Sequence, residues 1–469
     1  MTTECTTQQL CFEGLGRRQI VADFSGGDIS SDAGGLLLRQ TEGRTKILER
    51  FAECFLDFRN PGFIEHSMRD LVSQRVLAIA LGYEDIHDHD DLRHDPLLAA
   101  LVGKVDPKGE TRRSQRDRGK ALAGKSTLNR LELGTPGEAA GHRYKKVLLD
   151  PAAVDDLLVD VFLEAHEEPP AWIEIDVDAT DDPLHGQQEG RFFHGYYGCY
   201  CYLPLYVFCG DHLLGARLGT SDIAPYKSVV GELRRIVGRI RAAWPEVEIL
   251  IRGDSGFSQE SVMAWCEAHD LWYLLGLKRN TRLEAALAGD LARARQQYEE
   301  TEEPGRIFAE FDYRTLDSWS RSRRVIGKAE YLSGGPNPRF VVTNLPNAEF
   351  TAQEIYEQLY CMRSEVENRI KEQQLYMFAD RTSTATMLAN QIRLYFSSIA
   401  YTLVNALRRL GLAGTEMARA QCHTIRTKLL KIGARIRVTV RRVWVYLSSS
   451  HPYRALFIEA HQRLGAAPT

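Results

Sequence analysis

Residues 172–178, W-I-E-I-D-V-D, alternate strictly between apolar and acidic side chains. The two sides of this stretch are Ile173, Ile175 and Val177 on one, and Glu174, Asp176 and Asp178 on the other. Successive side chains of an extended chain point to opposite faces of a sheet, so the pattern predicts a strand with one buried face. The strand is expected to end at Asp178, where the small residues Ala179 and Thr180 follow.

The segments after this strand extend it into a sheet. Strands are predicted at 199–209 and 213–218, separated by the turn signal Gly210-Asp211. The later segments alternate, with helices at 226–243 and 258–269 and strands at 248–252 and 271–277. The order β-β-β-α-β-α-β implies a mixed α/β fold, with helices on the faces of a sheet that has both antiparallel and parallel pairs.

Residues 281–348 break this alternation. A charged helix near 283–297 precedes strand-like runs at 306–313, 322–332 and 339–344, which predicts a mostly β insertion. Further helices are predicted at 352–376, 383–410 and 415–432. Residues 434–447 alternate as one strand would.

The chain before residue 172 is predicted to be mainly helical. A short strand is expected at 17–23, and the helices are expected within 30–40, 66–82, 96–103 and 144–166. The sequence EEPP at 167–170 is a plausible boundary. The predicted division is 1–168 (helical N-terminal region), 169–280 (first part of the α/β core), 281–348 (insertion), 349–410 (second part of the core) and 411–469 (C-terminal region).

The charges are unevenly distributed along the chain. The 469 residues carry a formal net charge of −4, which taken whole argues mildly against a nucleic-acid binder. Residues 380–469, however, contain 14 Lys and Arg against three acidic residues, so residues 1–379 hold the remaining 45 basic and 60 acidic residues. Any expectation about partners therefore has to be made region by region.

The other compositional features are ordinary. Hydrophobic residues make up 44% and charged residues 26%, which argues against a disordered, collagen-like or disulfide-scaffold protein. Nine scattered cysteines without a C-x-x-C motif predict free thiols in a reducing compartment. No apolar run is long enough for a membrane span and no signal peptide is recognisable, so a cytoplasmic protein is expected.

Two aspartates lie at predicted strand ends. Asp178 ends the first strand, and Asp254 follows the buried run I-L-I-R-G. Carboxylates at the ends of neighbouring strands converge at one edge of a sheet, where open α/β sheets place their sites. A single strand-end Asp is more often a turn or helix cap, but two in this order favour a site.

A third acid lies on the predicted helix 352–376. The residues Tyr360, Arg363, Glu367 and Lys371 are spaced by three, four and four positions and so share one face. Such a face is often a solvated stripe of ion pairs. The neighbouring apolar residues Leu359, Met362 and Val366 indicate instead a helix packed against another element.

In combination these motifs resemble a known family. The strings D-x-D-A-T-D-D-x-x-H-G-Q-Q, I-R-G-D-S-G-F and Y-x2-R-x3-E, with the N-terminal D-I-S-S-D-A-G-G, are similar to those of bacterial insertion-sequence DDE transposases, in particular the group called transposase DDE domain, group 1. The resemblance extends from about residue 20 to 465. It implies an RNase H-like catalytic domain interrupted by a β insertion, with DNA as the partner.

The resemblance also implies site residues. Asp178, Asp254 and Glu367 would be catalytic and would hold two Mg²⁺ ions, for which Mn²⁺ can substitute. Three residues of the helix would contact DNA: Tyr360, Arg363 and Lys371. Related transposases often carry the Lys seven positions after the Glu, where this chain has Gln374, so the role passes to Lys371. Asp176, Asp181 and Asp182 are alternatives for the first carboxylate.

Two basic regions are expected to contact DNA backbone. The loop 104–130 carries nine Lys and Arg, among them Arg112, Arg113, Arg116, Arg118, Lys120 and Lys125. The C-terminal region contributes Arg435, Arg437, Arg441 and Arg442. Residues 119–126, G-K-A-L-A-G-K-S, match the letters of a P-loop, but T-R-R-S-Q-R-D-R precedes them instead of a buried strand, so nucleotide binding is not expected.

The predicted function is therefore a transposase that binds the terminal inverted repeats of an insertion sequence, cuts them and joins them to target DNA. Synapsis of two ends predicts a homodimer on DNA, associated with the nucleoid. The alternatives are a metal-dependent nuclease on the same fold that does not join ends, and a non-catalytic DNA-binding relative.

Overall fold

The computed structural model describes residues 9–133 and 145–466. The chain forms two compact units, one made of Met1–Leu148 with Ile399–Thr469 and the other of Leu149–Ser398. The predicted first part of the core and the insertion lie in the second unit, as does the predicted second part of the core up to Ser398; residues 399–410 belong to the first unit. The predicted C-terminal region lies with the N-terminal region in the first unit.

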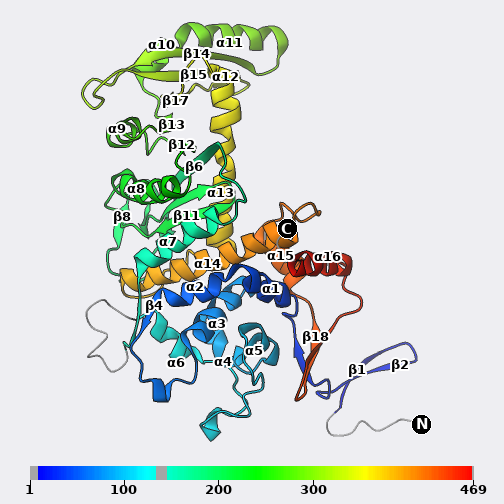
Figure 1. Cartoon of the computed structure of the whole chain (residues 1–469). Helices are drawn as coiled ribbons and strands as arrows, with labels where there is room; N and C mark the ends of the chain where they lie inside the picture. The colour runs from blue at the N-terminus through cyan, green and yellow to red at the C-terminus, as the bar shows by residue number, and fades with distance from the viewer. Residues whose placement is uncertain (1–8, 134–144, 467–469) are drawn as a thin grey trace. The chain divides into compact units, whose positions relative to one another are not determined.

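A nine-stranded mixed sheet organises the second unit (Figure 1). The strand order is β11-β10-β6-β12-β13-β17-β15-β14, with β16 paired to β15. The central strands β6 (Trp172–Ala179), β12 (Glu248–Gly253) and β13 (Trp272–Leu277) are parallel to one another. On one side β10 (Leu205–Cys209) and β11 (His212–Arg217) continue the sheet antiparallel. The expectation of a mixed sheet is confirmed.

The alternation along β6 divides its side chains between two layers. Ile173, Ile175 and Val177 are at most 5% exposed and belong to a core built with helices α8 (Tyr226–Ala243) and α9 (Glu260–Ala268). The opposite face packs its apolar residues, including Leu250 and Leu274, against Ile355 and Tyr356. The chain segment 352–376 therefore covers the face that carries the acidic residues of β6, opposite α8 and α9 in Figure 1.

The segment 352–376 is helical as predicted, but its winding changes along its length. It runs from α12 (Ala352–Glu354) through a π-helical stretch at Ile355–Tyr360 and a 3₁₀ turn at Cys361–Arg363 to α13 (Ser364–Lys371). A second π-helical stretch covers Glu372–Tyr376. Such stretches are rare in helices and occur frequently at functional sites.

The insertion continues the central sheet. Its helices α10 (Thr281–Ala286) and α11 (Ala288–Thr301) precede β14 (Gly305–Tyr313), β15 (Arg323–Leu332), β16 (Gly335–Pro336) and β17 (Arg339–Thr343). Strand β17 pairs antiparallel with β13, which joins the insertion to the core strands. The predicted β character of 281–348 is present, and helix α11 packs on β14 and β15.

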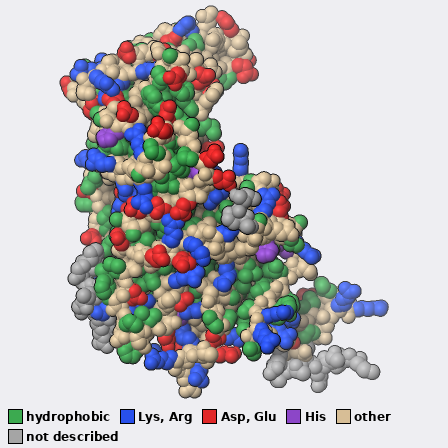
Figure 2. All heavy atoms as spheres, viewed as in Figure 1, with side chains coloured by type: hydrophobic (Ala, Val, Ile, Leu, Met, Phe, Trp, Pro, Cys, Tyr) green, Lys and Arg blue, Asp and Glu red, His purple; other side chains and the backbone are tan. Residues whose placement is uncertain are grey.

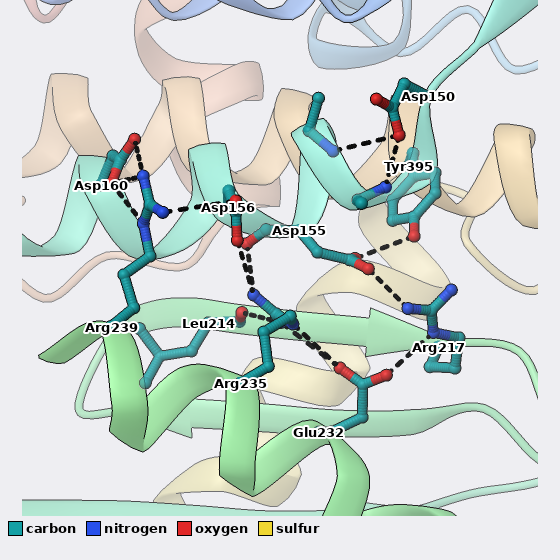
Figure 3. A network of polar contacts seen from close by, with 12 residues as sticks. Asp150, Asp155, Asp156, Asp160, Leu214, Arg217, Glu232, Arg235, Arg239 and Tyr395 are labelled. Atoms are coloured by element: carbon teal, nitrogen blue, oxygen red, sulfur yellow. Dashed lines mark hydrogen bonds and ion pairs between the residues drawn. The ribbon is translucent and has the colours of Figure 1, made fainter.

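Helix α7 (Pro151–Leu163) belongs to the second unit, although residues 144–166 were expected in the N-terminal region. Its acidic residues pair with arginines of β11 and α8 (Figure 3). Asp155 contacts Arg217 at 2.5 Å and accepts from the Tyr395 hydroxyl at 2.8 Å. Asp160 receives two hydrogen bonds from Arg239, at 2.7 and 2.8 Å. These long-range ion pairs, which sequence periodicity does not reveal, place the unit boundary before α7.

The first unit is mainly helical, as predicted. Its elements are β1 (Leu10–Leu15), β2 (Arg18–Ala22), β3 (Asp28–Ser30), α1 (Gly35–Thr45), α2 (Ile47–Glu53), β4 (Phe55–Asp57), α3 (Met68–Leu81), α4 (His89–Leu92), α5 (Pro96–Val102), α6 (Lys125–Leu128), β5 (Val147–Leu149), α15 (Cys422–Ile425), β18 (Ala434–Val438), β19 (Val443–Leu447) and α16 (Arg454–Gly465). Helix α14 (Met387–Gly411) spans the division between the units.

The C-terminal segments differ from their prediction. Residues 434–447 form a hairpin, β18 and β19, because the chain turns at Thr439–Arg442, where two hydrogen bonds join Thr439 and Arg442 at 2.9 and 3.1 Å. Strand β18 also pairs with β3 of the N-terminal segment. The helix predicted at 415–432 begins only at Cys422.

Membrane spans and cysteines were also predicted from the sequence. Among the described residues, no helix is long and apolar enough to cross a membrane. Seven of the described cysteines are free. Cys11 is disulfide-bonded, so the expectation that every cysteine is a free thiol is wrong at this position.

The packing of the insertion gives a test of the fold. A Cβ atom at Gly305 would overlap the backbone carbonyl of Ala294 in α11, whereas a Cβ atom at Gly289 of the same helix would meet nothing within 4 Å. We predict that Gly305→Ala lowers the free energy of unfolding by about 2–3 kcal/mol, because backbone cannot yield as a side chain can.

The control Gly289→Ala should leave stability unchanged or raise it by up to about 1 kcal/mol, since alanine favours helix. Urea denaturation followed by circular dichroism measures both. Equal stability of the two variants would contradict the packing of β14 on α11.

Candidate active site

Asp178 and Asp254 lie side by side at one edge of the sheet. The parallel register of β6 and β12 pairs Val177 with Gly253, so Asp178 is the next residue of β6 and Asp254 is the first residue after β12. The alternation along β6 places Asp178 on the face opposite the Ile173, Ile175 and Val177 side chains, and the charge of Asp254 acts on its carboxyl. The convergence expected from the strand ends is therefore present.

Helix α13 brings a cation and a third acid to this pair. The Arg363 guanidinium contacts Asp178 at 3.1 Å and Glu367 at 3.4 Å. The side chains of Arg363 and Asp178 are 13% and 15% exposed, and that of Glu367 is 51% exposed. Arg363 thus bridges a buried acid of the sheet and an accessible acid of the helix.

The electrostatics of Asp178 show how close these acids lie. Burial raises the pKa of its carboxyl to about 6, Arg363 opposes the rise, and the charges of Asp254 and Glu367 add to it. Mutual repulsion among three carboxylates is the expected result of gathering them at one point. The site consequently favours binding of additional positive charge.

Asp176 has a different environment from Asp178, although both lie on one strand face. Its carboxylate receives two hydrogen bonds from Arg252 of β12, each 2.8 Å long, and it is 1% exposed. Arg252 also contacts Glu174 at 2.7 Å and donates to the Leu359 carbonyl at 2.7 Å. Asp176 is therefore engaged by Arg252 inside the protein, which leaves Asp178 as the acid of β6 that contacts Arg363.

The other two alternatives for the first carboxylate lie beyond the end of β6. Asp182 is 1% exposed in β7 (Asp182–Pro183), and burial together with the charges of Asp380 and Asp181 raises its pKa to about 8. The backbone carbonyl of Asp181 accepts a hydrogen bond from Gln374 at 3.1 Å. Neither Asp181 nor Asp182 takes part in the ion pairs of Arg363, which are with Asp178 and Glu367.

The remaining helix residues differ in their surroundings. Tyr360 packs against the strand β13, where a Cβ atom at Gly276 would lie 2.5 Å from the tyrosine hydroxyl oxygen. The absence of a side chain at Gly276 thus makes room for Tyr360 beside Asp254 and Ser255. Lys371 is exposed at the end of α13.

Two residues near these acids were not singled out by sequence reasoning. Arg252 was present in the run I-L-I-R-G, where a cation inside an otherwise buried strand is the signal that could have found it. Tyr197 has a pKa raised to about 12, by burial and by neighbouring groups that include Asp178 and Asp254. Its position in an irregular stretch offered no periodic signal.

The donor set can be compared with what a divalent cation needs. Among the described residues no group of three His, Cys, Asp or Glu side chains has an arrangement that holds a metal ion. The chemistry of the site nevertheless fits such an ion, because carboxylate oxygens are the ligands that Mg²⁺ prefers and because the pKa of Asp178 is raised by burial and further by the charges of Asp254 and Glu367.

The predicted basic residues of the loop 104–130 have partners within the first unit. Arg112 contacts Glu65 at 2.5 Å, Lys125 contacts Asp90 at 3.3 Å, and Lys120 donates to the Arg116 carbonyl at 2.7 Å. Arg113 donates to the Gly62 carbonyl at 2.7 Å. Part of the positive charge in this loop is therefore used to hold the loop itself.

The arginines of the β18–β19 hairpin are exposed. Arg435 lies over the ring of Tyr446 at 5.3 Å and Arg442 over that of Trp444 at 5.4 Å. Arg437 pairs with Trp444 across the strands. The hairpin thus presents a guanidinium and aromatic face, and Figure 2 shows Lys and Arg side chains gathered near its end. Sequence reasoning found these arginines but not their aromatic neighbours.

The fold and the site define an α/β protein with a carboxylate cluster at the end of its central parallel strands. The chain belongs to the family described as transposase DDE domain, group 1, whose pattern matches residues 12–469. The family resemblance expected from the motifs is confirmed. No curated protein matches the chain. Membership implies transposition-related cleavage of DNA, with DNA as the partner and divalent metal ions as the usual cofactors of the family.

The contrast between Asp176 and Asp178 can be tested by matched substitutions. Asp176→Asn should lower the free energy of unfolding by about 3 kcal/mol, because it removes the more deeply buried of the two carboxylates that compensate Arg252. Asp178→Asn should instead match or exceed the wild type by up to about 2–3 kcal/mol at pH 8 in EDTA.

The raised pKa of Asp178 explains why Asp178→Asn is expected to increase the free energy of unfolding at pH 8. Protonation stabilises the fold below the ordinary pKa of about 4, and this stabilisation is lost as the pH rises through about 6. The difference between Asp178→Asn and the wild type should therefore disappear below pH ~4. Thermal melts in EDTA between pH 4 and 8 measure it, and a strong destabilisation by Asp178→Asn would overturn the distinction.

Proposed function

We propose that this protein is a DDE transposase that binds the terminal inverted repeats of an insertion sequence, cleaves DNA at their ends and joins the ends to target DNA. The observation that carries the proposal is the meeting of Asp178, Asp254 and the Arg363–Glu367 pair at one sheet edge in a member of this family. The strand order β11-β10-β6-β12-β13 supports an RNase H-like core, because three antiparallel strands precede two parallel ones.

The proposed catalytic residues are Asp178, Asp254 and Glu367, which would hold two Mg²⁺ ions, or Mn²⁺ in their place. Such a pair of ions activates the attacking water or 3′-hydroxyl and stabilises the leaving oxygen of an in-line displacement at phosphorus. Asp178 and Asp254 approach from the rigid sheet and Glu367 from the helix. The position of helix α13 relative to the sheet therefore determines the geometry of the site.

Other residues of the site would act on the DNA itself. Arg363 presents a planar guanidinium that can form two parallel hydrogen bonds with a phosphate. Lys371 is exposed and would add a point charge further along the strand. Tyr360 lies on Gly276 beside Asp254 and would limit the space available to the scissile end.

DNA recognition is assigned to the first unit, which contains residues 1–148 and the C-terminal region. Arg112, Arg113, Lys120 and Lys125 would contribute from the loop, and Arg435, Arg437, Arg441 and Arg442 from the hairpin. Strand transfer of two ends requires two active sites, so a homodimer on DNA is part of the proposal.

The alternative is a metal-dependent nuclease on the same fold that hydrolyses DNA without joining it. An in vitro assay with labelled inverted-repeat ends, a target plasmid and Mg²⁺ distinguishes the two. Joined products support the transposase, and cleaved ends that never join support the nuclease.

The catalytic assignment predicts the effect of three substitutions. Asp178→Asn, Asp254→Asn and Glu367→Gln should each lower the rate of strand cleavage by at least about 10³-fold, because each removes a metal-binding carboxylate. Binding of end DNA in EDTA should change less than about threefold, since the metal ions are absent from that measurement.

The matched control is Glu365→Gln, which removes an exposed acid from the same helix. It should retain nearly full cleavage activity. Full activity of Glu367→Gln, or equal loss in Glu365→Gln, would contradict the assignment.

The hairpin assignment predicts a salt-dependent effect. Arg437→Gln should weaken duplex binding and reduce the slope of log K against log salt by about 0.9, the value for one phosphate contact. The control Arg419→Gln removes an exposed charge elsewhere in the C-terminal region. Fluorescence anisotropy between 50 and 300 mM salt measures both, and indistinguishable slopes for the two variants would exclude a specific role of the hairpin.

A further inference from the structure

Strands β7, β8 and β9 form a small sheet beyond the end of β6. Strand β9 (Cys199–Tyr202) pairs antiparallel with β7 and with β8 (Phe192–His194). The Thr180 amide donates to the Pro204 carbonyl at 3.3 Å, so this small sheet begins close to the point where β6 ends. The proposed function uses no residue of the β8–β9 hairpin (residues 191–200).

The β8–β9 hairpin exposes five aromatic side chains within ten residues. Tyr196 is 86% exposed and Phe193 is 58% exposed. The other exposed aromatic residues of the hairpin are Phe192, Tyr197 and Tyr200. Contiguous exposed apolar surface is uncommon on globular proteins and often marks an interaction site.

The exposed rings are fixed by contacts within the second unit. Phe193 and Tyr200 are paired across the strands, and their rings meet edge to face with centroids 5.5 Å apart. The Arg191 guanidinium lies 4.2 Å from the centre of the Tyr200 ring and donates to the Gly186 carbonyl. A surface that is ordered before its ligand arrives loses less conformational freedom on binding.

Tyr197 lies between these rings and the proposed catalytic acids. Its ring meets that of Tyr196 edge to face, with centroids 5.0 Å apart. Burial raises its pKa to about 12, and the charges of Asp181, Asp178 and Asp254 add to the rise. Because charge interactions weaken with distance, the Tyr197 hydroxyl is close to these acids. A molecule held at the carboxylates therefore borders the β8–β9 hairpin.

The chemistry of the hairpin narrows the class of ligand. Residues 190–204 contain one arginine and one histidine but no acidic residue. Aromatic faces beside a cation are typical of surfaces that stack the bases of a single strand and tolerate its negative backbone. In a duplex the base faces are hidden within the stack, so only unpaired nucleotides can use such rings.

We propose that the β8–β9 hairpin is a binding surface for single-stranded DNA, on which unpaired bases next to the scissile phosphate stack. Phe193 and Tyr196 would supply ring faces, and Arg191 on the Tyr200 ring would supply a cation. The inference rests on the proposed function, because it takes DNA to be the ligand of the neighbouring acids. It adds that the strands of the DNA end separate at the site, which three carboxylates alone do not require.

The test measures binding by the full chain in EDTA, so that cleavage has no part in it. The probes are a fluorescent mixed-sequence single strand of about 12 nucleotides and the blunt duplex of the same sequence. Phe193→Ala and Tyr196→Ala should each weaken binding of the single strand about 5- to 10-fold and change binding of the duplex less than about twofold.

The matched control is Leu316→Ala, which removes a 77% exposed apolar side chain from the insertion of the same unit. It should bind both probes as the wild type does. Circular dichroism checks folding. The Tyr196→Ala comparison decides the question even where Phe193→Ala does not fold, because Tyr196 is the most exposed ring of the hairpin.

Conservative substitutions separate stacking from simple apolar contact. Phe193→Tyr keeps a ring and should retain binding of the single strand, whereas Phe193→Leu keeps apolar bulk and should weaken it as Phe193→Ala does. The slope of log K against log salt should stay unchanged in Phe193→Ala and fall by about 0.7 in Arg191→Gln, since only the second variant removes a charge near the backbone.

The proposal is overturned if Phe193→Ala and Tyr196→Ala bind the single strand as Leu316→Ala does. If the same two variants also lose self-association in analytical ultracentrifugation, the hairpin is a contact between copies of the chain instead. Single-strand binding through the hairpin by a protein that never joins DNA ends would contradict the proposed function and leave this inference standing.

Discussion

The buried charge of Arg252 is the constraint on which the arrangement of the site depends. Its guanidinium contacts Asp176 and Glu174 of the neighbouring strand and the Leu359 carbonyl of the helical segment that covers the sheet. A buried cation is tolerated only when it is paired and hydrogen-bonded, so these three contacts must form together. They join β6, β12 and the helix that carries Arg363 and Glu367. The position of Glu367 relative to Asp178 follows from them.

The carboxylates that this arrangement gathers repel one another. Burial and the charges of Asp254 and Glu367 raise the pKa of Asp178 to about 6, although Arg363 and a hydrogen bond from the Ala179 amide partly offset the rise. Structural ion pairs in the same unit, such as Asp160 with Arg239, satisfy both partners. The contrast separates a cluster suited to binding further positive charge from pairs that stabilise the fold.

The basic residues likewise fall into two classes, those that stabilise the fold and those that are exposed to solvent. Arg426 donates to the carbonyls of Ala80 and Ile79, and Lys431 contacts Asp32, so both hold the first unit together. The arginines of the β18–β19 hairpin face solvent beside aromatic rings. A regional count of charge cannot distinguish these classes, because it records neither burial nor partners.

The sequence alone determined the features that depend on neighbours along the chain. The alternation at 172–178 predicted the strand, its buried face and the exit of Asp178, and the strand order predicted a mixed sheet with Asp254 beside it. Only the tertiary structure distinguished Asp176 from Asp178, since the partner of Asp176 is 76 residues away on another strand. It also placed α7 with the sheet and folded 434–447 into a hairpin. The reason is physical: side-chain periodicity is a local property of the backbone, whereas the pairing of buried charges depends on which distant segments meet.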